Sequence, residues 1–248
     1  MPLYQYVKSV SSPHRRNKSS VVPSMVLMGL GGAILLWALW PILSFAVISD
    51  AVFSRVVSPV SDVQVKKNPS LLSPVAFAAS TVTQPQDSLA SFVNPNAWYP
   101  AQPQKRVVTP VNTYTLSIPK LKIDNAMVVI AGDDLGKSLV HYGGTGLPGQ
   151  YGTAVVFGHS TLPQFYSPTN YKTIFSLLPT LKIGDEIDIT YDDMRYRYVI
   201  YEMIVLDPSD LSVLEQRFDD SYLTLITCVP PGTYWKRLNV KAKLSNPQ

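Results

Sequence analysis

The sequence predicts one mostly β domain, a barrel or a sandwich, that follows a membrane-spanning helix and a proline-rich linker. Three features of the chain support this. A long apolar stretch lies near the N-terminus, a segment rich in proline follows it, and the rest of the chain alternates between short apolar runs and turn residues. Many short strands with few and short helices are typical of a β barrel or sandwich.

Residues 25–49 are predicted to form an uncleaved, single-pass membrane anchor, preceded by a basic tail of residues 1–24. No charged residue occurs between Ser19 and Ser49, and about 20 apolar residues suffice for a helix to cross the hydrocarbon core. All four charged residues before this stretch are basic, which predicts a cytoplasmic N-terminus and an extracytoplasmic domain. A cleaved signal peptide is the alternative, but its apolar region would span only about 7–15 residues.

Residues 50–109 are predicted to form an extended linker that lifts a domain away from the membrane. Seven prolines are spread over this segment, and no helical or alternating period survives such spacing. Trp98 and Tyr99 are its best candidates for a contact with the domain. The domain itself is predicted to comprise residues 110–246.

Within the predicted domain, strands are expected wherever apolar residues alternate or form a short continuous run. The run 153–159 is almost continuously apolar, as expected of a strand buried on both faces. The other predicted strands are residues 114–118, 125–130, 186–191, 195–206, 222–228 and 238–244, and short helices or turns are expected at 135–141, 171–178 and 211–214.

The distribution of charge argues against nucleic acid as a partner. The chain has a formal net charge of +4. Residues 1–108 carry nine basic and three acidic residues, whereas residues 109–248 carry twelve and fourteen. A nucleic-acid-binding domain concentrates basic charge on its folded part, but here the folded part is mildly acidic.

The one cysteine of the chain, Cys228, is the candidate nucleophile. It ends the predicted strand 222–228, directly before a Pro-Pro-Gly turn, and a strand end beside a loop is accessible to a substrate. An odd cysteine in an exported protein indicates a free thiol, whereas a buried strand cysteine can also be simply a small apolar residue. A reactive thiolate needs positive charge nearby.

Two further residues can complete such a site. His159 ends the apolar run 153–159 and can act as an acid or a base near neutral pH. Arg237 begins the strand after Cys228, and its guanidinium can hold a carbonyl or a developing oxyanion. A structural histidine and a solvated arginine are the alternatives. His141 is expected to have a structural role.

These residues lie in motifs that resemble the sortases, membrane-anchored cysteine transpeptidases of bacterial cell surfaces. Residues 224–228 match the Thr-Leu-x-Thr-Cys signature of that family, Gly158-His159 matches its histidine motif, and Arg237 has the expected position after the cysteine. Further similar segments are 116–120, 141–149 and 181–187. The resemblance covers roughly residues 113–244 and implies a closed eight-stranded β-barrel.

The resemblance also implies a reaction. Cys228 attacks a Thr carbonyl in a Leu-Pro-x-Thr-Gly-like sorting signal near the C-terminus of a substrate protein, and His159 protonates the departing amine. Arg237 supports the oxyanion, assisted by the backbone near Thr227. An amine, such as a cell-wall precursor or a pilin lysine, then resolves the thioester. No metal or organic cofactor is implied, and a calcium-activated form is not expected because no acidic cluster follows His159.

The alternation of side chains along the strands predicts that the substrate groove is lined by Ala154, Val156, Thr224 and Ile226, together with the segment 198–214. Ser160 stands where many family members have Arg, which leaves the subclass undecided. Two other functions stay open: an exported cysteine peptidase that only hydrolyses, and a non-catalytic surface protein built on the same barrel. A peptidoglycan cross-linking enzyme of the unrelated type is disfavoured because its His-Gly-x-x-Cys neighbourhood is missing.

Overall fold

The computed structural model describes residues 21–52, 93–105 and 109–245. Most of the predicted basic tail and of the predicted linker therefore lies outside the described residues. Helix α1 (Val21–Val52) contains the segment Pro23–Phe45, 23 residues with mean hydropathy 2.0, which is long and apolar enough to cross a membrane. Pro41 lies inside the helix, and the hydroxyl of Ser44 donates to its carbonyl at 3.2 Å.

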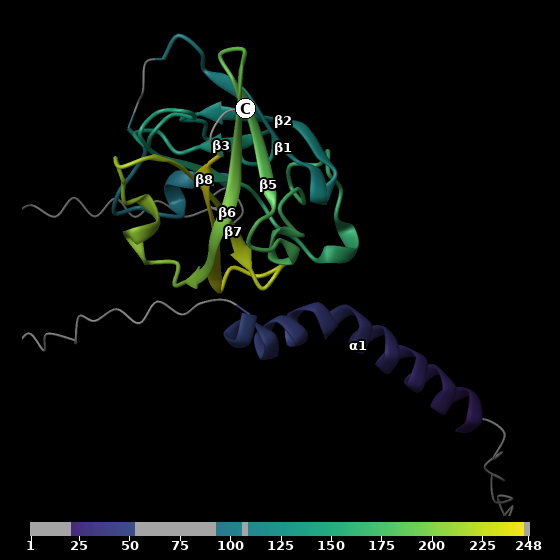
Figure 1. Cartoon of the computed structure of the whole chain (residues 1–248). Coiled ribbons are helices and arrows are strands. Elements are labelled where there is room, and N and C mark those ends of the chain that lie inside the picture. Colours follow the sequence, from purple (N-terminus) through teal and green to yellow (C-terminus); the bar gives the residue numbers. More distant parts are fainter. Residues whose placement is uncertain (1–20, 53–92, 106–108, 246–248) are drawn as a thin grey trace, which may run out of the picture. The chain divides into compact units, whose positions relative to one another are not determined.

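Eight strands close into a barrel in the order β1-β2-β3-β4-β7-β8-β6-β5 (Figure 1). Neighbouring strands are antiparallel except for the pairs β2–β3 and β4–β7, which are parallel. This confirms the predicted closed, eight-stranded, mostly β barrel. The strands are β1 (Thr113–Ile118), β2 (Ile123–Ile130), β3 (Leu139–His141), β4 (Gly152–Phe157), β5 (Glu186–Tyr191), β6 (Met194–Leu206), β7 (Ser221–Val229) and β8 (Lys236–Leu244).

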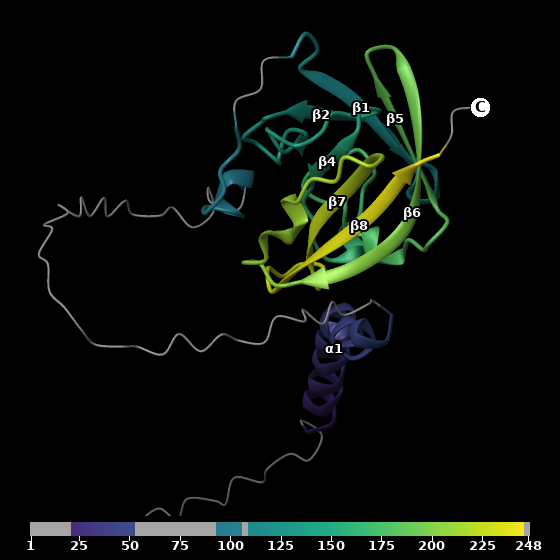
Figure 2. The ribbon, with the colours of Figure 1, turned by 60° about the vertical axis from the view of Figure 1, so that its left-hand side comes forward.

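Both faces of β4 are buried, as the continuous apolar run 153–159 predicted, and both faces of β7 are buried as well. Side chains on one face, such as Val156 and Leu225, belong to the core inside the barrel. Side chains on the other face, such as Phe157 and Ile226, belong to a second apolar cluster outside it. Since successive side chains of a strand point to opposite faces, the alternation decides which cluster each residue joins. Figure 2 shows β7 and β8 side by side next to β6.

One short 3₁₀ helix, η2 (Pro95–Ala97), precedes β1, and four others lie in the connections between strands: η3 (Pro119–Leu121), η4 (Pro163–Phe165), η5 (Leu178–Thr180) and η6 (Leu211–Leu214). The last of these confirms the short helix or turn predicted at 211–214. The short helix expected at 135–141 is wrong, because residues 139–141 instead form β3. Pairing with β2 on one side and β4 on the other satisfies the backbone of this strand, and three residues are too few for a sequence pattern to reveal it.

Part of the predicted linker is packed against the barrel. Trp98 and Tyr99 are only 5% and 1% exposed, which confirms that these two residues contact the domain. Residues 93–105 form the covering segment of the barrel. Their polar groups are bonded to the barrel, because Leu135 N donates to the carbonyl of Val93 at 3.0 Å and the hydroxyl of Tyr142 donates to the carbonyl of Gln102 at 2.5 Å.

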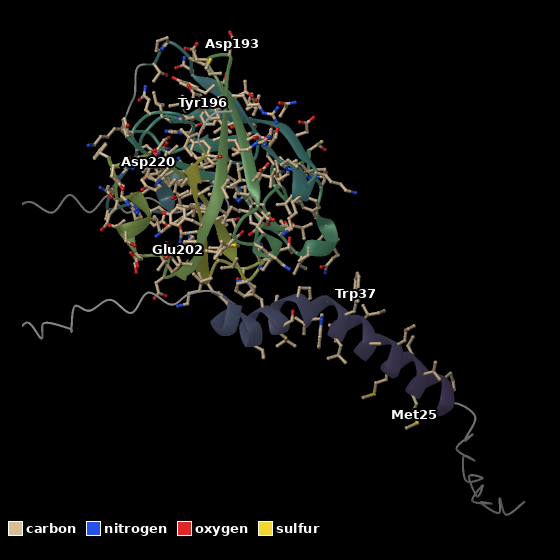
Figure 3. All side chains as sticks on the ribbon, in the orientation of Figure 1. Met25, Trp37, Asp193, Tyr196, Glu202 and Asp220 are labelled. Carbon is tan, nitrogen blue, oxygen red and sulfur yellow. The ribbon has the colours of Figure 1, made fainter. Side chains whose placement is uncertain are left out.

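Strands β5 and β6 form a long hairpin with the tight turn Asp192-Asp193. Both aspartates have positive φ, 52° and 59°, as the two central residues of a type I′ turn require. Figure 3 labels Asp193 at the tip of this hairpin. Further along β6, the ring of Tyr196 packs so closely on Gly149 that an added Cβ there would lie 2.2 Å from it.

Candidate active site

Cys228 and Arg237 are direct partners in the antiparallel register of β7 and β8. Arg237 Nη1 donates to Cys228 Sγ at 3.4 Å and to the carbonyl of Tyr234 at 3.2 Å. The two residues are 2% and 6% exposed. Among the described residues, Arg237 Nε finds no hydrogen-bond acceptor. The Arg237 guanidinium therefore lies against the thiol, and its buried Nε–H remains a donor without an acceptor among the described residues.

His159 follows β4 by two residues and is tied to the end of β7. The backbone N of Gly158 donates to Ile226 at 3.1 Å, and the hydroxyl of Thr227 donates back to the carbonyl of Gly158 at 2.9 Å. On the other side, the hydroxyl of Ser160 donates to the carbonyl of Cys228 at 2.6 Å. These bonds brace the backbone on both sides of the imidazole. They also bring its strand end beside that of the cysteine.

Only glycine fits at position 158. A Cβ built there would lie 2.4 Å from the ring of Phe175 and 2.7 Å from Leu139. The backbone N of Phe175 donates to the carbonyl of His159 at 3.0 Å. The glycine therefore lets Phe175 and Leu139 pack closely against this backbone, and the hydrogen bond from Phe175 fixes the position of His159.

Trp98 of the covering segment packs near both His159 and Arg237 of the predicted site. Its ring centroid lies 6.1 Å from that of His159, and the Arg237 guanidinium carbon lies 4.7 Å above the same ring. Between the described residues, no hydrogen bond joins His159 to Cys228. A cation over an indole face is attracted by the ring quadrupole, so Trp98 holds the arginine while it covers the site.

The thiol lies at one end of an apolar cluster that the covering segment completes. Trp98 and Tyr99 both pack on the ring of Phe157, with centroids 5.5 Å and 5.8 Å apart. The cluster comprises Trp98, Tyr99, Leu135, Val140, Tyr142, Val155, Phe157, Ile204, Leu206, Val213, Leu214, Ile226 and Cys228. Any ligand that reaches Cys228 must take the place of part of this cover.

Burial changes the protonation of the site. Desolvation raises the pKa of Cys228 to about 11, although the adjacent Arg237 opposes the rise. Desolvation also lowers the pKa of His159, and it raises the pKa of Tyr99, whose hydroxyl has no partner among the described residues. With the covering segment in place, the thiol and the imidazole are therefore both neutral at pH 7.

The predicted groove residues fall into two groups. Ile226 shares the cluster of Cys228, and Thr224, which is buried, lies two residues before it on the same face of β7. Ala154 and Val156 instead belong to the core inside the barrel. On β4, the side chains that join the cysteine's cluster are Val155 and Phe157. Both faces of this strand are apolar, so the sequence offered no amphipathic pattern that could choose between them.

His141 lies in the barrel away from the thiol. Its Nδ1 is 2.9 Å from the hydroxyl of Tyr114 and its Nε2 is 3.2 Å from Oγ1 of Thr145. Burial lowers the pKa of His141 to about 4, and this satisfied, neutral histidine agrees with the structural role expected for it. Within the described part of the chain, no three His, Cys, Asp or Glu side chains are grouped as metal ligands would be.

Comparison with known proteins points to one family. The model of the family described as Sortase domain matches residues 116–245. A curated relative, Sortase D of Bacillus subtilis strain 168, is 26% identical over 118 residues, which are 46% of this chain and 53% of the relative. The match thus spans about half the length of that relative.

Three of the solved structures that the chain matches are named as sortases. The sortase D5 transpeptidase of Clostridium perfringens is 28% identical, with 57% of this chain and 83% of that chain covered and a TM-score of 0.47. Sortase A of Corynebacterium diphtheriae is 29% identical, with 58% and 64% covered and a TM-score of 0.48. Sortase C-1 of Actinomyces oris is 26% identical, with 54% and 73% covered and a TM-score of 0.48.

Proposed function

Because this chain belongs to the sortase family, we propose that it is a cysteine transpeptidase that cleaves a sorting signal near the C-terminus of substrate proteins and transfers them to an amine. The observation that carries the proposal is the 3.4 Å contact of Arg237 Nη1 with Cys228 Sγ, at strand ends that also hold His159. A buried thiol of purely structural use has no need of a guanidinium beside it.

The acylation step begins with transfer of the thiol proton of Cys228 to His159. The thiolate then attacks the Thr carbonyl of a Leu-Pro-x-Thr-Gly-like signal, and a C–S bond forms. As the Thr–Gly amide bond breaks, the imidazolium of His159 gives its proton to the leaving amine. The product is a thioester between Cys228 and the substrate protein. Proton exchange between a thiol and an imidazole makes the rate bell-shaped in pH.

The thioester is resolved by an incoming amine, for example of a cell-wall precursor or a pilin lysine. The amine nitrogen attacks the thioester carbonyl and gives a proton to His159. The C–S bond breaks, the thiolate of Cys228 is regenerated, and a new amide remains. Water in place of the amine would give hydrolysis, which separates a transpeptidase from a peptidase.

Arg237 is the proposed oxyanion donor. Its Nη1 already points to the sulfur, and its unused Nε is a buried donor without an acceptor among the described residues. A preorganised donor in a dry site stabilises a developing negative charge more than it does in water. The hydroxyl of Thr227 is engaged with Gly158, so only the backbone near Thr227 is proposed to assist at the oxyanion.

Turnover requires the covering segment to move. Cys228 is 2% exposed, and Trp98 lies over Arg237 where a scissile carbonyl would have to bind. We therefore assign the described arrangement to a closed form of the enzyme.

The proposed location follows from helix α1. Its apolar segment Pro23–Phe45 would anchor the protein in the cell membrane, and the basic residues before it favour a cytoplasmic N-terminus. The barrel would then act at the outer face, where sorting signals and amine acceptors meet.

Intact-mass spectrometry of the full chain in detergent micelles tests this function. The chain is incubated with a Leu-Pro-x-Thr-Gly peptide library, with and without triglycine, and Cys228→Ala is the control. A thioester adduct that is absent in Cys228→Ala, together with a triglycine-ligated product, supports the proposal. Cleavage without ligation points to a peptidase. If neither the wild-type chain nor Trp98→Ala forms an adduct, the proposal is contradicted.

A further inference from the structure

The loop between β6 and β7 forms one wall of the cluster around the thiol. Its 3₁₀ helix η6 contributes Val213 and Leu214, which are 3% and 8% exposed and belong to the same apolar cluster as Cys228. The start of η6 is capped by Asp210, whose carboxylate accepts from Ser212 N at 2.9 Å. This cap lies within the loop itself, so it does not explain what holds the loop against the barrel.

One side chain, Gln216, joins this loop to the opposite connection. Its Oε1 accepts from the backbone N of Gly146 at 3.0 Å and from that of Thr153 at 3.1 Å. The same amide donates through Nε2 to the carbonyl of Leu214 at 3.2 Å. Two of these bonds reach the β3–β4 connection at Gly146 and strand β4 at Thr153, and the third holds the same amide to the end of η6.

Gly146, one partner of Gln216, lies close to the backbone of Gly152 and Thr153. The backbone N of Gly146 also donates to the carbonyl of Thr153 at 3.0 Å. A Cβ at Gly146 would lie 2.9 Å from Thr153 N and 3.1 Å from Gly152 Cα. The two backbone donors therefore converge on one point, where a single carbonyl-type oxygen can accept from both. A glutamine supplies that acceptor and, at the same time, the donor that Leu214 requires.

We propose that Gln216 is a positioning residue that holds η6 in its place in the apolar cluster of Cys228 and so preorganises the groove for the substrate peptide. The inference rests on the proposed peptidyl transfer. A loop that is already ordered costs less entropy to bind a ligand than a loop that orders on binding. Gln216 acts through η6 without touching the thiol, so it should affect how well the peptide binds and not how fast it reacts.

The test compares Gln216→Leu with wild type and with Gln150→Leu, which removes an exposed glutamine from the β3–β4 connection. The full chain in detergent micelles is used with the Leu-Pro-x-Thr-Gly peptide that wild type cleaves fastest. Gln216→Leu removes all three hydrogen bonds of the amide, each with a modest net contribution, which predicts a KM raised about tenfold. The kcat should stay within about twofold, and Gln150→Leu should show no change. A wild-type KM, or a loss confined to kcat, overturns the proposal.

A second variant and a second measurement keep the test decisive. Gln216→Glu retains the acceptor and removes the donor to Leu214, so its KM should lie between wild type and Gln216→Leu, and this variant decides the matter if Gln216→Leu does not fold. If wild type cleaves no peptide, the proposed function fails. Hydrogen exchange then tests separately whether Gln216 holds η6 in place. Faster exchange over residues 207–216 in Gln216→Leu than in Gln150→Leu supports it, and equal exchange overturns it.

Discussion

Replacement of Trp98 by alanine should turn the buried thiol into a reactive one. Trp98 covers Arg237 and packs on Phe157, and Cys228 below it is 2% exposed with a pKa raised to about 11 by desolvation. Removal of a large buried aromatic side chain typically costs about 3–5 kcal/mol. Because the barrel core is a separate cluster, this loss is expected to free the covering segment and leave the barrel folded.

The magnitude follows from the pKa of the thiol. With a pKa of about 11, only about one molecule in a thousand holds the thiolate at pH 8. If solvent access returns the pKa of Cys228 to its ordinary value of 9.0, the thiolate fraction at pH 8 becomes about one in eleven. The alkylation rate should therefore rise about 90-fold from ionisation alone, and steric access adds to this.

The chain contains a single cysteine, so iodoacetamide labelling followed by intact-mass spectrometry reports on Cys228 alone. Rates are measured from pH 6 to 11 for wild type, Trp98→Ala and Trp235→Ala. Trp235 is 61% exposed in the loop between β7 and β8, which makes it a matched control with no expected effect. A wild-type rate and pH midpoint in Trp98→Ala would refute the reasoning that the covering segment, and not the barrel, buries the thiol.

Three further predictions concern charge and the hairpin. Replacement of Arg237 by leucine should raise the pKa of Cys228 further and lower kcat by about 10²–10³, and an unchanged alkylation midpoint would contradict this. Because the pKa of His141 falls from 6.5 to about 4 in the fold, its unfolded form binds more protons between these values. The free energy of unfolding should thus fall by about 3 kcal/mol between pH 7 and pH 4. Urea titrations at both pH values should show a smaller fall in His141→Gln. Asp192→Asn with Asp193→Gly should raise Tm by about 2–4 °C, and a lower Tm in calorimetry would exclude a type I′ turn there.

The strands of the barrel were largely predictable because their signal is local. Alternation and continuous apolar runs marked the strands that contain Ile189, Val155 and Leu225, each within a few residues of the observed bounds. Strand β3 was missed, since its three residues are fixed by pairing with β2 and β4 and not by any pattern of their own. The strand ends that hold Cys228 and Arg237 were predictable for the same local reason, because one short loop, residues 230–235, joins their strands.

The partners of Trp98 and Gln216 had no comparable signal, although the sequence did indicate that Trp98 contacts the domain. Trp98 meets Arg237 across more than a hundred residues of sequence, and Gln216 meets Gly146 across seventy. Such contacts depend on how the closed barrel places its loops, and neither periodicity nor turn chemistry encodes that. The three predicted site residues Cys228, His159 and Arg237 can thus be located from strand ends, whereas the proposed roles of Trp98 and Gln216 depend on contacts between distant segments. A chain with the same three site residues but another side chain at position 98 or 216 should catalyse the same reaction. Its thiol should differ in reactivity, or its KM for the substrate peptide should differ.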